Sequence, residues 1–224
     1  MKKLLCIVST FLIISCSQDV YDKGEGKYSL LRGDFAEAVV NSNQQVTKIV
    51  TDDGDELSLT APYTAKWVSK ADTTYRCMLY YNKVRDAKGQ YTAEPISVGM
   101  VPCPKIGSIS ELETPMKTDP VRFESAWISK TGKYLNLSLI LMTGTTEVED
   151  AIHTLRVLQD TIIANPDGSS TSHILLYHDQ GGVPEYYSTP LYASIITSQI
   201  PADSVRITIN TYKGIIEKAF LIKR

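Results

Sequence analysis

Residues Thr74 to Val84 read TYRCMLYYNKV, and two sets of side chains alternate in this stretch with a period of two. Successive side chains of a β-strand point to opposite faces of a sheet. One face would carry Tyr75, Cys77, Leu79 and Tyr81, and the opposite face would carry Arg76, Met78, Tyr80 and Asn82. Such alternation is typical of a strand with one face turned to a core, so it favours an all-β fold.

Shorter β-like stretches flank this strand on both sides. Thr51-Asp52-Asp53-Gly54 contains Asp-Gly, the dipeptide most typical of tight hairpins, and Lys88-Gly89 supplies a second turn. Besides 74–84, the expected strands of the first half are 35–40, 46–50, 56–59 and 96–101. About five strands within about eighty residues suit a small barrel. We therefore expect a β-barrel domain at residues 30–112.

The second half carries its own β signals after a loop at 109–119, where charge and proline replace any apolar period. Alternate leucines at 135, 137, 139 and 141 would line one face of a strand. The stretch 153–163 fits a helix or a strand, and its β-branched residues together with the Asn-Pro-Asp-Gly turn that follows favour a strand. Roughly seven short strands separated by turns predict an antiparallel β-sandwich, which we place at residues 113–224.

The first residues have the form of a bacterial lipoprotein signal. Lys2 and Lys3 precede an apolar stretch, residues 4–14, which is too short for the ~20 residues of a membrane-spanning helix. Ile13-Ile14-Ser15-Cys16 then matches a lipobox, in which the cysteine thiol takes the lipid before cleavage. We expect a signal peptide at 1–15, a stable anchor of acyl chains such as palmitate on Cys16, and a flexible polar tether at 16–29.

The charge and the motif content of the sequence argue against several classes of function. The formal net charge is −2, and it becomes more negative when Lys2 and Lys3 leave with the signal, so the sequence shows no electrostatic footprint for a nucleic-acid partner. His153, His173 and His178 form no metal-ligand motif, and no Gly-x-Ser-x-Gly elbow is present. The sequence predicts no catalytic residue, no metal site and no cofactor.

Two cysteines remain for the folded part of the chain, Cys77 and Cys103. In an exported protein they could form a disulfide, because that compartment can be oxidising. Both cysteines also stand in apolar, strand-like surroundings, where two buried free thiols are as reasonable. The sequence leaves both states open.

Thirteen tyrosines make aromatic side chains the best candidates for ligand contacts. Tyr75, Tyr80 and Tyr81 lie on the expected long strand, where flat rings could stack on sugars while cations such as Arg76 contact anionic groups. The alternative is that these rings belong to the core and rim of a half-buried sheet. Tyr186-Tyr187, beside a Gly- and Pro-containing stretch, could form a second contact patch.

Two stretches of the chain resemble a known family. KIVTDDGDEL (Lys48 to Leu57) in the first half, followed by DPVRFESAWISKTGKYLNLSLIL (Asp119 to Leu141), is similar to the NigD-like lipoproteins. The resemblance extends over essentially the whole chain after Cys16. It implies an N-terminal OB-like barrel followed by a C-terminal β-sandwich, and it offers no catalytic residues to carry over. The family takes its name from a bacteriocin-associated gene cluster.

These predictions together describe a non-catalytic, lipid-anchored protein of the bacterial cell envelope with a binding or structural role. We place it at the outer membrane, since Ser17 after the lipidated residue disfavours retention at the inner membrane. The chain would contact the membrane through its N-terminal lipid. The expected partner is another envelope protein, such as a toxin neutralised at the surface, and the alternative is a glycan bound by the barrel aromatics.

Overall fold

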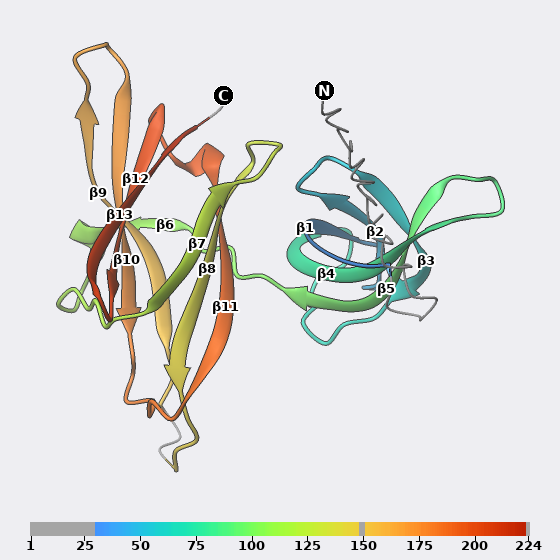
Figure 1. Ribbon diagram of the computed structural model, residues 1–224, viewed down its shortest axis with the longest axis horizontal. Helices are drawn as coiled ribbons and strands as arrows, with labels where there is room; N and C mark the ends of the chain where they lie inside the picture. Colours follow the sequence, from blue (N-terminus) through green and yellow to red (C-terminus); the bar gives the residue numbers. More distant parts are fainter. Residues whose placement is uncertain (1–29, 148–150, 223–224) are drawn as a thin grey trace, which may run out of the picture.

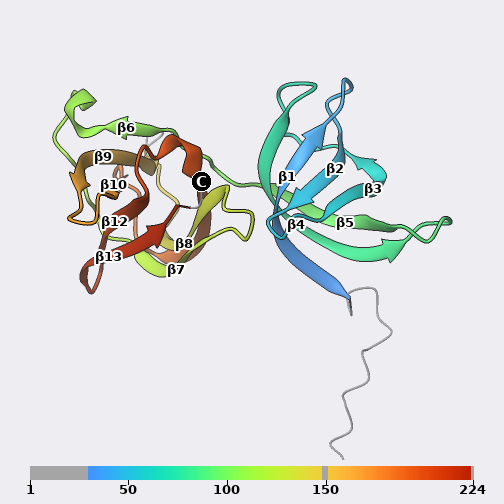
Figure 2. The same ribbon diagram turned by 90° about the horizontal axis from the view of Figure 1, so that it is seen from above.

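The computed structural model describes residues 30–147 and 151–222. In these ranges the chain forms two β domains that lie side by side and are joined by an extended crossing near residue 102 (Figures 1 and 2). The first domain is a closed barrel and the second consists of two sheets, so the all-β class and the order of barrel and sandwich are confirmed. Among the described residues, no helix has the length and apolar character needed to cross a membrane.

Five strands close the barrel in the order β1-β2-β3-β5-β4, the arrangement of an OB fold. β1 pairs with β4 to complete the circle, and β3 meets β5 in parallel at Leu59 and Ala93. Gly54 forms the expected turn between β2 and β3 with φ +91°, a conformation that glycine adopts without strain. The strands are β1 (Leu31–Val40), β2 (Val46–Thr51), β3 (Glu56–Tyr63), β4 (Thr74–Arg85) and β5 (Tyr91–Met100).

The inward half of the period-two pattern fills the barrel. On β4, Cys77, Leu79 and Tyr81 are fully buried, and they share a core with the small alanines of β1. The Tyr81 hydroxyl donates a hydrogen bond to Asp34 at 2.8 Å, which satisfies the polar atom of this buried ring. The alternation of residues 74–84 therefore separates the barrel core from its outer face, as the sequence predicts.

Two packed sheets form the second domain. The larger has the order β13-β12-β10-β9-β6, and the smaller has the order β11-β8-β7. β10 and β12 pair in parallel, because the chain crosses to the other sheet through β11 between them. The elements are β6 (Ile106–Ser108), η1 (Ile109–Glu111), β7 (Arg122–Ile128), β8 (Tyr134–Thr143), β9 (Thr154–Ala164), β10 (Ser170–Asp179), β11 (Tyr187–Ile196), η2 (Thr197–Gln199), β12 (Ser204–Thr211) and β13 (Gly214–Leu221).

The boundary between the domains lies earlier than the sequence predicts. β6 pairs in parallel with β9 through residues 106–108, so these residues belong to the sandwich and not to a barrel domain that extends to residue 112. A three-residue strand has too few side chains to show a period, which is why the loop signals around it dominate. The ambiguous stretch at 153–163 is strand β9, as its β-branched residues predict.

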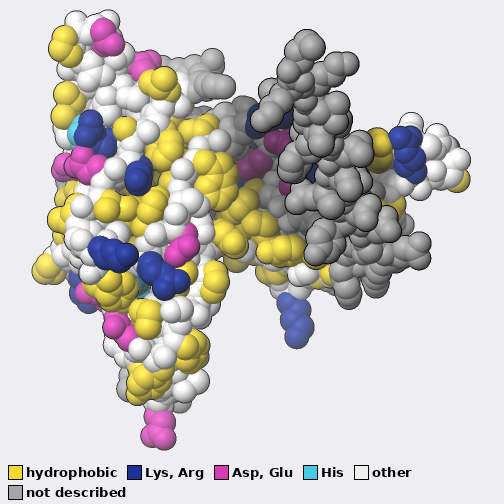
Figure 3. Space-filling model, viewed as in Figure 1, with side chains coloured by type: hydrophobic (Ala, Val, Ile, Leu, Met, Phe, Trp, Pro, Cys, Tyr) yellow, Lys and Arg dark blue, Asp and Glu magenta, His cyan; other side chains and the backbone are white. Residues whose placement is uncertain are grey.

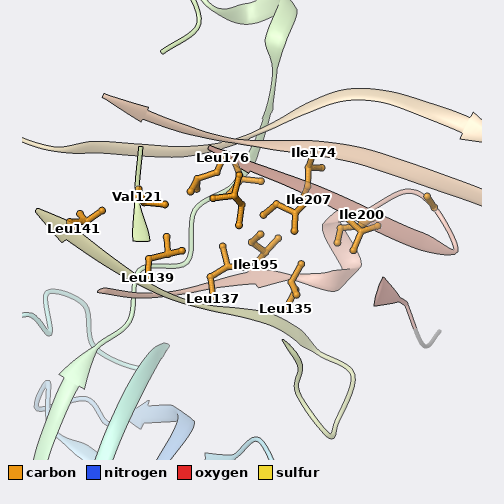
Figure 4. Close-up of a cluster of buried hydrophobic side chains, with 14 residues drawn as sticks. Val121, Leu135, Leu137, Leu139, Leu141, Ile174, Leu176, Ile195, Ile200 and Ile207 are labelled. Atoms are coloured by element: carbon orange, nitrogen blue, oxygen red, sulfur yellow. The ribbon is translucent and has the colours of Figure 1, made fainter. Parts of the chain in front are cut away.

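The alternate leucines of β8 form the centre of the sandwich core (Figure 4). Leu135, Leu137 and Leu139 are fully buried, and they pack with isoleucines of the larger sheet such as Ile174 on β10 and Ile207 on β12. Burying one such side chain stabilises a fold by about 1.5–3 kcal/mol. This layer therefore holds the two sheets together.

Candidate functional site

Two of the three histidines, His153 and His178, lie together in the sandwich. No group of three or more His, Cys, Asp or Glu side chains is arranged there to hold a metal ion. His178 is buried and stacks on His153 with ring centroids 5.3 Å apart, whereas His173 is half-buried on the other side of β10. Because a carbonyl only accepts, His178 Nδ1 donates to the Asp119 backbone oxygen at 2.9 Å. His178 Nε2 lies 3.0 Å from His153 Nδ1, within hydrogen-bonding distance.

A buried polar cluster lies where the two domains meet. Arg76, on the outward face of β4, has a side chain that is only 2% exposed. Its guanidinium donates to both carboxylate oxygens of Asp52 at 2.7 Å, and across the junction it donates to Asn136 Oδ1 at 2.9 Å and Ser194 Oγ at 3.1 Å. Asn136 also donates to Asp52 at 2.8 Å. Since these groups satisfy one another, the cluster favours one relative placement of barrel and sandwich.

Aromatic rings from both domains pack around the Arg76 side chain of this cluster. The Arg76 guanidinium lies 3.9 Å from the ring centroid of Tyr134, a cation–π contact across the junction. Phe35 of the barrel packs edge-on against two sandwich rings, Trp127 at 5.4 Å and Tyr192 at 5.3 Å between centroids. The junction therefore combines apolar burial with a directional polar network.

A second set of charged contacts lies at the rim of the junction. Glu37 on β1 accepts hydrogen bonds from Lys133 Nζ and from the Tyr134 hydroxyl, both at 2.6 Å. Burial by itself would raise the pKa of Glu37, but the two hydrogen bonds and the charge of Lys133 together lower it. Burial and the hydrogen bond to Glu37 raise the pKa of Tyr134. Glu37 is thus a charged acceptor and Tyr134 a neutral donor around pH 7, as these bonds require.

The structure does not bring the three barrel tyrosines of the predicted ligand face together. Tyr81 is fully buried, because it belongs to the inward half of the alternation, and its assignment to a ligand face is wrong. The Tyr75 hydroxyl accepts hydrogen bonds from backbone N–H groups of the 69–70 loop. Tyr80 is exposed on the opposite face of β4, where its ring covers Gly33. The core-and-rim interpretation of these tyrosines describes the barrel better.

Cys77 and Cys103 are both free thiols, so they form no disulfide with each other. Cys77 points into the barrel core, and Cys103 is half-buried in the crossing between the domains. Burial raises the pKa of Cys77 to about 12 and also raises that of Cys103, so both are protonated and poor nucleophiles at neutral pH. Cys16, the signal peptide and the tether at 16–29 lie outside the described residues.

Exposed large side chains gather at the end of the sandwich where β8 ends and β11 begins, remote from the domain junction. Tyr186 is 74% exposed and Tyr187 is 51% exposed, as expected for the contact patch predicted there. Ile152 and Tyr212 are exposed as well. We call these four residues the distal surface; hydrophobic side chains are visible at the lower end of the sandwich in Figure 3.

The loop that carries the distal surface is held by specific contacts. Tyr186 donates its backbone N–H to the last residue of β8 at 2.9 Å, and the Tyr212 hydroxyl donates to Glu185 Oε1 at 2.8 Å. Gly181 has φ +60°, and a Cβ there would lie 2.1 Å from the backbone oxygen of Ile152, so only glycine fits. The tyrosine rings therefore project from a loop with a defined backbone, which lowers the entropy lost when they bind a partner.

Sequence reasoning finds half of the distal surface and misses the junction. The Tyr186-Tyr187 pair is visible because it stands beside turn residues, whereas Ile152 and Tyr212 reach this end of the sandwich from elsewhere in the chain. The junction depends on Arg76 meeting partners as far as 118 residues away. The only sign of the junction in the sequence is Arg76, the one arginine on the outward face of residues 74–84. An arginine at such a position could equally be exposed to solvent.

The comparison with protein families agrees with this architecture. The profile of the NigD-like C-terminal beta sandwich domain matches residues 104–221, more than half of the chain. The chain belongs to the NigD-like family. The matched segment begins just before β6, which is also the first strand of the sandwich in this NigD-like chain. None of the curated proteins matches it in sequence.

Several solved structures share the two-domain fold. A NigD-like immunity protein from Bacteroides caccae is 20% identical with a TM-score of 0.66, covering 86% of this chain and 97% of that one. A toxin-related protein from Parabacteroides distasonis, so described in its name, is 16% identical with a TM-score of 0.62. The match covers 85% of this chain and 92% of that one. A candidate lipoprotein from Bacteroides fragilis is 13% identical with a TM-score of 0.58. The match covers 86% of this chain and 98% of that one. At such identities the likeness shows the fold alone.

Proposed function

We propose that this NigD-like chain is a non-catalytic, lipid-anchored protein of the cell envelope that binds a protein partner through the distal surface. The distal surface is the observation that carries this proposal. Four exposed large side chains, three of them tyrosines, lie at this end of the sandwich; Tyr187 is the first residue of β11, and the other three lie outside the strands. Tyrosine is enriched at protein interfaces because its ring is large and rigid and its hydroxyl can still form hydrogen bonds.

The family supports a toxin as the partner. The name of the Bacteroides caccae protein with this fold describes it as an immunity protein. We infer that the present chain has a related task and neutralises a toxin of the bacteriocin type by occupying part of its surface. Such a task needs affinity and no chemistry, which agrees with a distal surface that lacks a converging set of acid, base and nucleophile among the described residues.

The N-terminal sequence supports attachment to the envelope, and the junction would orient the distal surface there. The lipobox ending at Cys16 would hold the chain at a membrane, and we place it at the outer membrane. The described fold begins with the barrel, which lies beside the sandwich (Figure 2). The distal surface lies on the sandwich. Because the Arg76 cluster fixes the two domains together, the barrel would act as a spacer that holds the distal surface in one orientation.

Glycan binding by the barrel is the alternative, and one observation supports it. Tyr91 is 50% exposed, and the cations Lys83 and Arg85 lie over its ring. Tyr80 and Tyr91 are the two tyrosines of the barrel that are exposed, and they lie on different strands, β4 and β5. A sugar-binding face would need the rings to converge, and the burial of Tyr81 removes the third ring that the sequence predicted for it.

Affinity capture followed by titration tests the proposal. The wild-type chain and the double variant Tyr186→Ala/Tyr187→Ala would be used to capture proteins from the native envelope, and the protein lost with the double variant would be purified and titrated. Two tyrosines at the centre of an interface cost about 2 kcal/mol or more when truncated, so affinity should fall at least about thirtyfold. Tyr80→Ala/Tyr91→Ala is the matched control and should bind like wild type. Loss of binding only with this barrel control would reject the distal surface.

A further inference from the structure

A small pocket lies at one edge of the sandwich, where the outer strands of the two sheets, β7 and β13, approach each other. Its volume is about 210 Å³, below the range of about 300–1,000 Å³ that is typical of small-molecule sites. A pocket of this size suits one side chain of a partner better than a whole ligand. We call it the edge pocket, and its lining includes Val121, Arg122, Phe123, Tyr212, Lys213 and Ile216.

The floor of the edge pocket is apolar. Val121 is fully buried, and its backbone N–H donates to the backbone oxygen of Asn210 at 3.1 Å, which ties the chain just before β7 to β12. Phe123 on β7 and Ile216 on β13 are half-buried and pack against the sandwich core. These side chains therefore extend the apolar core to the surface at this edge.

Two exposed cations stand beside this apolar floor. On β13, Ile216 and Phe220 face the core, so Lys218 between them lies on the same face, and its Nζ is 5.4 Å from the ring centroid of Phe123. Lys213 lines the pocket from the turn after β12. Neither lysine forms an ion pair with another of the described residues.

The neighbouring charged groups leave these two cations uncompensated. Arg122 pairs with Glu124 at 3.1 Å. Two acids lie close to the Tyr212 ring without lining the pocket: Glu185 accepts from the Tyr212 hydroxyl at 2.8 Å, and Asp119 accepts from the backbone N–H of residue 180 at 2.7 Å. The pocket itself therefore presents positive charge next to an apolar floor, which is complementary to an apolar group flanked by carboxylates.

The edge pocket is continuous with the distal surface, because Tyr212 belongs to both. The hydrogen bond from Tyr212 to Glu185 joins the turn after β12 to the loop that carries Tyr186 and Tyr187. A partner that covers these two tyrosines would therefore reach the edge pocket along the same side of the sandwich.

We propose that the edge pocket receives an acidic segment of the protein partner, in which one aliphatic side chain stands next to aspartate or glutamate. This inference rests on the proposed function and adds the chemistry of the partner to it. The aliphatic side chain would cover Phe123 and Ile216, and the carboxylates would pair with Lys213 and Lys218. An inward-pointing lysine on an edge strand disfavours the addition of another strand, so the partner would enter with side chains and not by extending the sheet.

Fluorescence anisotropy with a labelled peptide tests the edge pocket without the natural partner. The probe is a short rhodamine-labelled peptide in which aspartates flank one leucine, and the comparison peptide carries asparagines at the same positions. We expect the full chain to bind the aspartate peptide at least about threefold more tightly, and we expect added salt to reduce this preference because exposed charge pairs are screened. Equal binding of the two peptides, or binding of neither, would overturn the proposal.

Matched variants test where the peptide binds. Lys213→Gln/Lys218→Gln should weaken the aspartate peptide about fivefold and leave the asparagine peptide unchanged, since two exposed charge pairs are lost. Arg206→Gln removes an exposed cation of β12 that pairs with Glu217, and it should change neither affinity. Melting curves confirm that both variants fold. Equal affinity of the wild type and the double lysine variant for the aspartate peptide would reject the edge pocket as the site.

The variant Tyr186→Ala/Tyr187→Ala separates this inference from the proposed function. It should lose the captured partner and still bind the aspartate peptide like wild type. If it retains the partner, the proposed function fails, whereas the peptide titration still decides the edge pocket. If the double lysine variant binds the purified partner as tightly as wild type, the edge pocket fails and the proposed function stands. Light scattering that showed a dimer of the chain, dissociated by Lys218→Gln, would assign the pocket to a second copy and overturn the proposal.

Discussion

Replacing Arg76 by methionine should uncouple the two domains. Methionine retains an apolar stem of similar length, but it removes the guanidinium that donates to Asp52, Asn136 and Ser194. The Asp52 carboxylate then stays at the junction without its cation, and the hydrogen bond from the Asn136 amide remains. Removing one member of such a pair leaves a partly buried charge without compensation, which destabilises far more than the loss of a surface pair.

The magnitude follows from the burial of the two partners. Breaking a buried ion pair costs about 3–5 kcal/mol. The Arg76 side chain is 2% exposed, but that of Asp52 is 17% exposed, so water can solvate the carboxylate in part. We therefore expect a loss near the lower limit, about 3 kcal/mol. With a urea m-value of roughly 2–3 kcal/mol/M, the midpoint of unfolding would fall by about 1 M.

Urea unfolding followed by tryptophan fluorescence is a suitable assay, because each domain contains one tryptophan. Trp67 lies in the barrel, where its Nε1 donates to the Val98 carbonyl, and Trp127 lies in the sandwich at the junction. Trp67→Phe and Trp127→Phe backgrounds report the two domains separately. We expect coincident transitions with Arg76 present and separate transitions in Arg76→Met.

The control for this experiment is an exposed ion pair of the sandwich. Arg206→Met breaks the contact between Arg206 and Glu217, whose side chains are 44% and 51% exposed, and should cost less than about 1 kcal/mol. If Arg76→Met changed stability by no more than this control, or if the two tryptophans still reported one shared transition, the Arg76 cluster would not be what couples the domains.

Three further predictions concern other parts of the chain. Burial, and to a lesser extent the charge of the neighbouring His178, lowers the pKa of His153 in the folded protein. Below about pH 6.5 the unfolded chain therefore binds a proton more readily than the folded chain does. Stability should fall as the pH drops through that value. Thermal melts across pH 5–8 should show this fall weakened in His153→Gln and retained in a variant of the half-buried His173. Gly181→Ala should destabilise the protein by several kcal/mol in chemical denaturation, because the added Cβ meets a backbone oxygen, whereas Gly89→Ala, with φ +79° and open space around it, should cost only about 1 kcal/mol. Cys16→Ala should leave the chain without acyl chains, so membranes washed with carbonate should no longer retain it; full retention would refute the lipid anchor.

Local alternation explains why the strands could be predicted. Residues 74–84 show which side chains of β4 face the barrel core, and the leucines of β8 do the same for the sandwich, because side-chain direction in a strand depends only on neighbouring residues. The assignment of Tyr81 failed for a different reason. An aromatic ring with a hydroxyl suits both a core and a binding face, and its hydrogen bond to Asp34 is a contact between different strands.

Contacts between distant residues explain what the sequence could not predict. Arg76 and Asn136 are 60 residues apart and meet only once both domains have formed. β6 is recognisable as part of the sandwich only through its pairing with β9, some fifty residues further along the chain. The distal surface is an intermediate case, since Tyr186 and Tyr187 are adjacent in sequence but Tyr212 reaches them through the turn after β12.

Site-specific photo-crosslinking in living cells tests the central claim most directly. A benzophenone side chain would replace Tyr187 on the distal surface in one strain and Tyr91 on the barrel in another; both tyrosines are about half exposed, so the crosslinker is equally accessible. Illumination should join one defined protein to position 187 and not to position 91. A protein adduct formed only at position 91, or no adduct at position 187 in cells that express the corresponding toxin, would contradict binding through the distal surface.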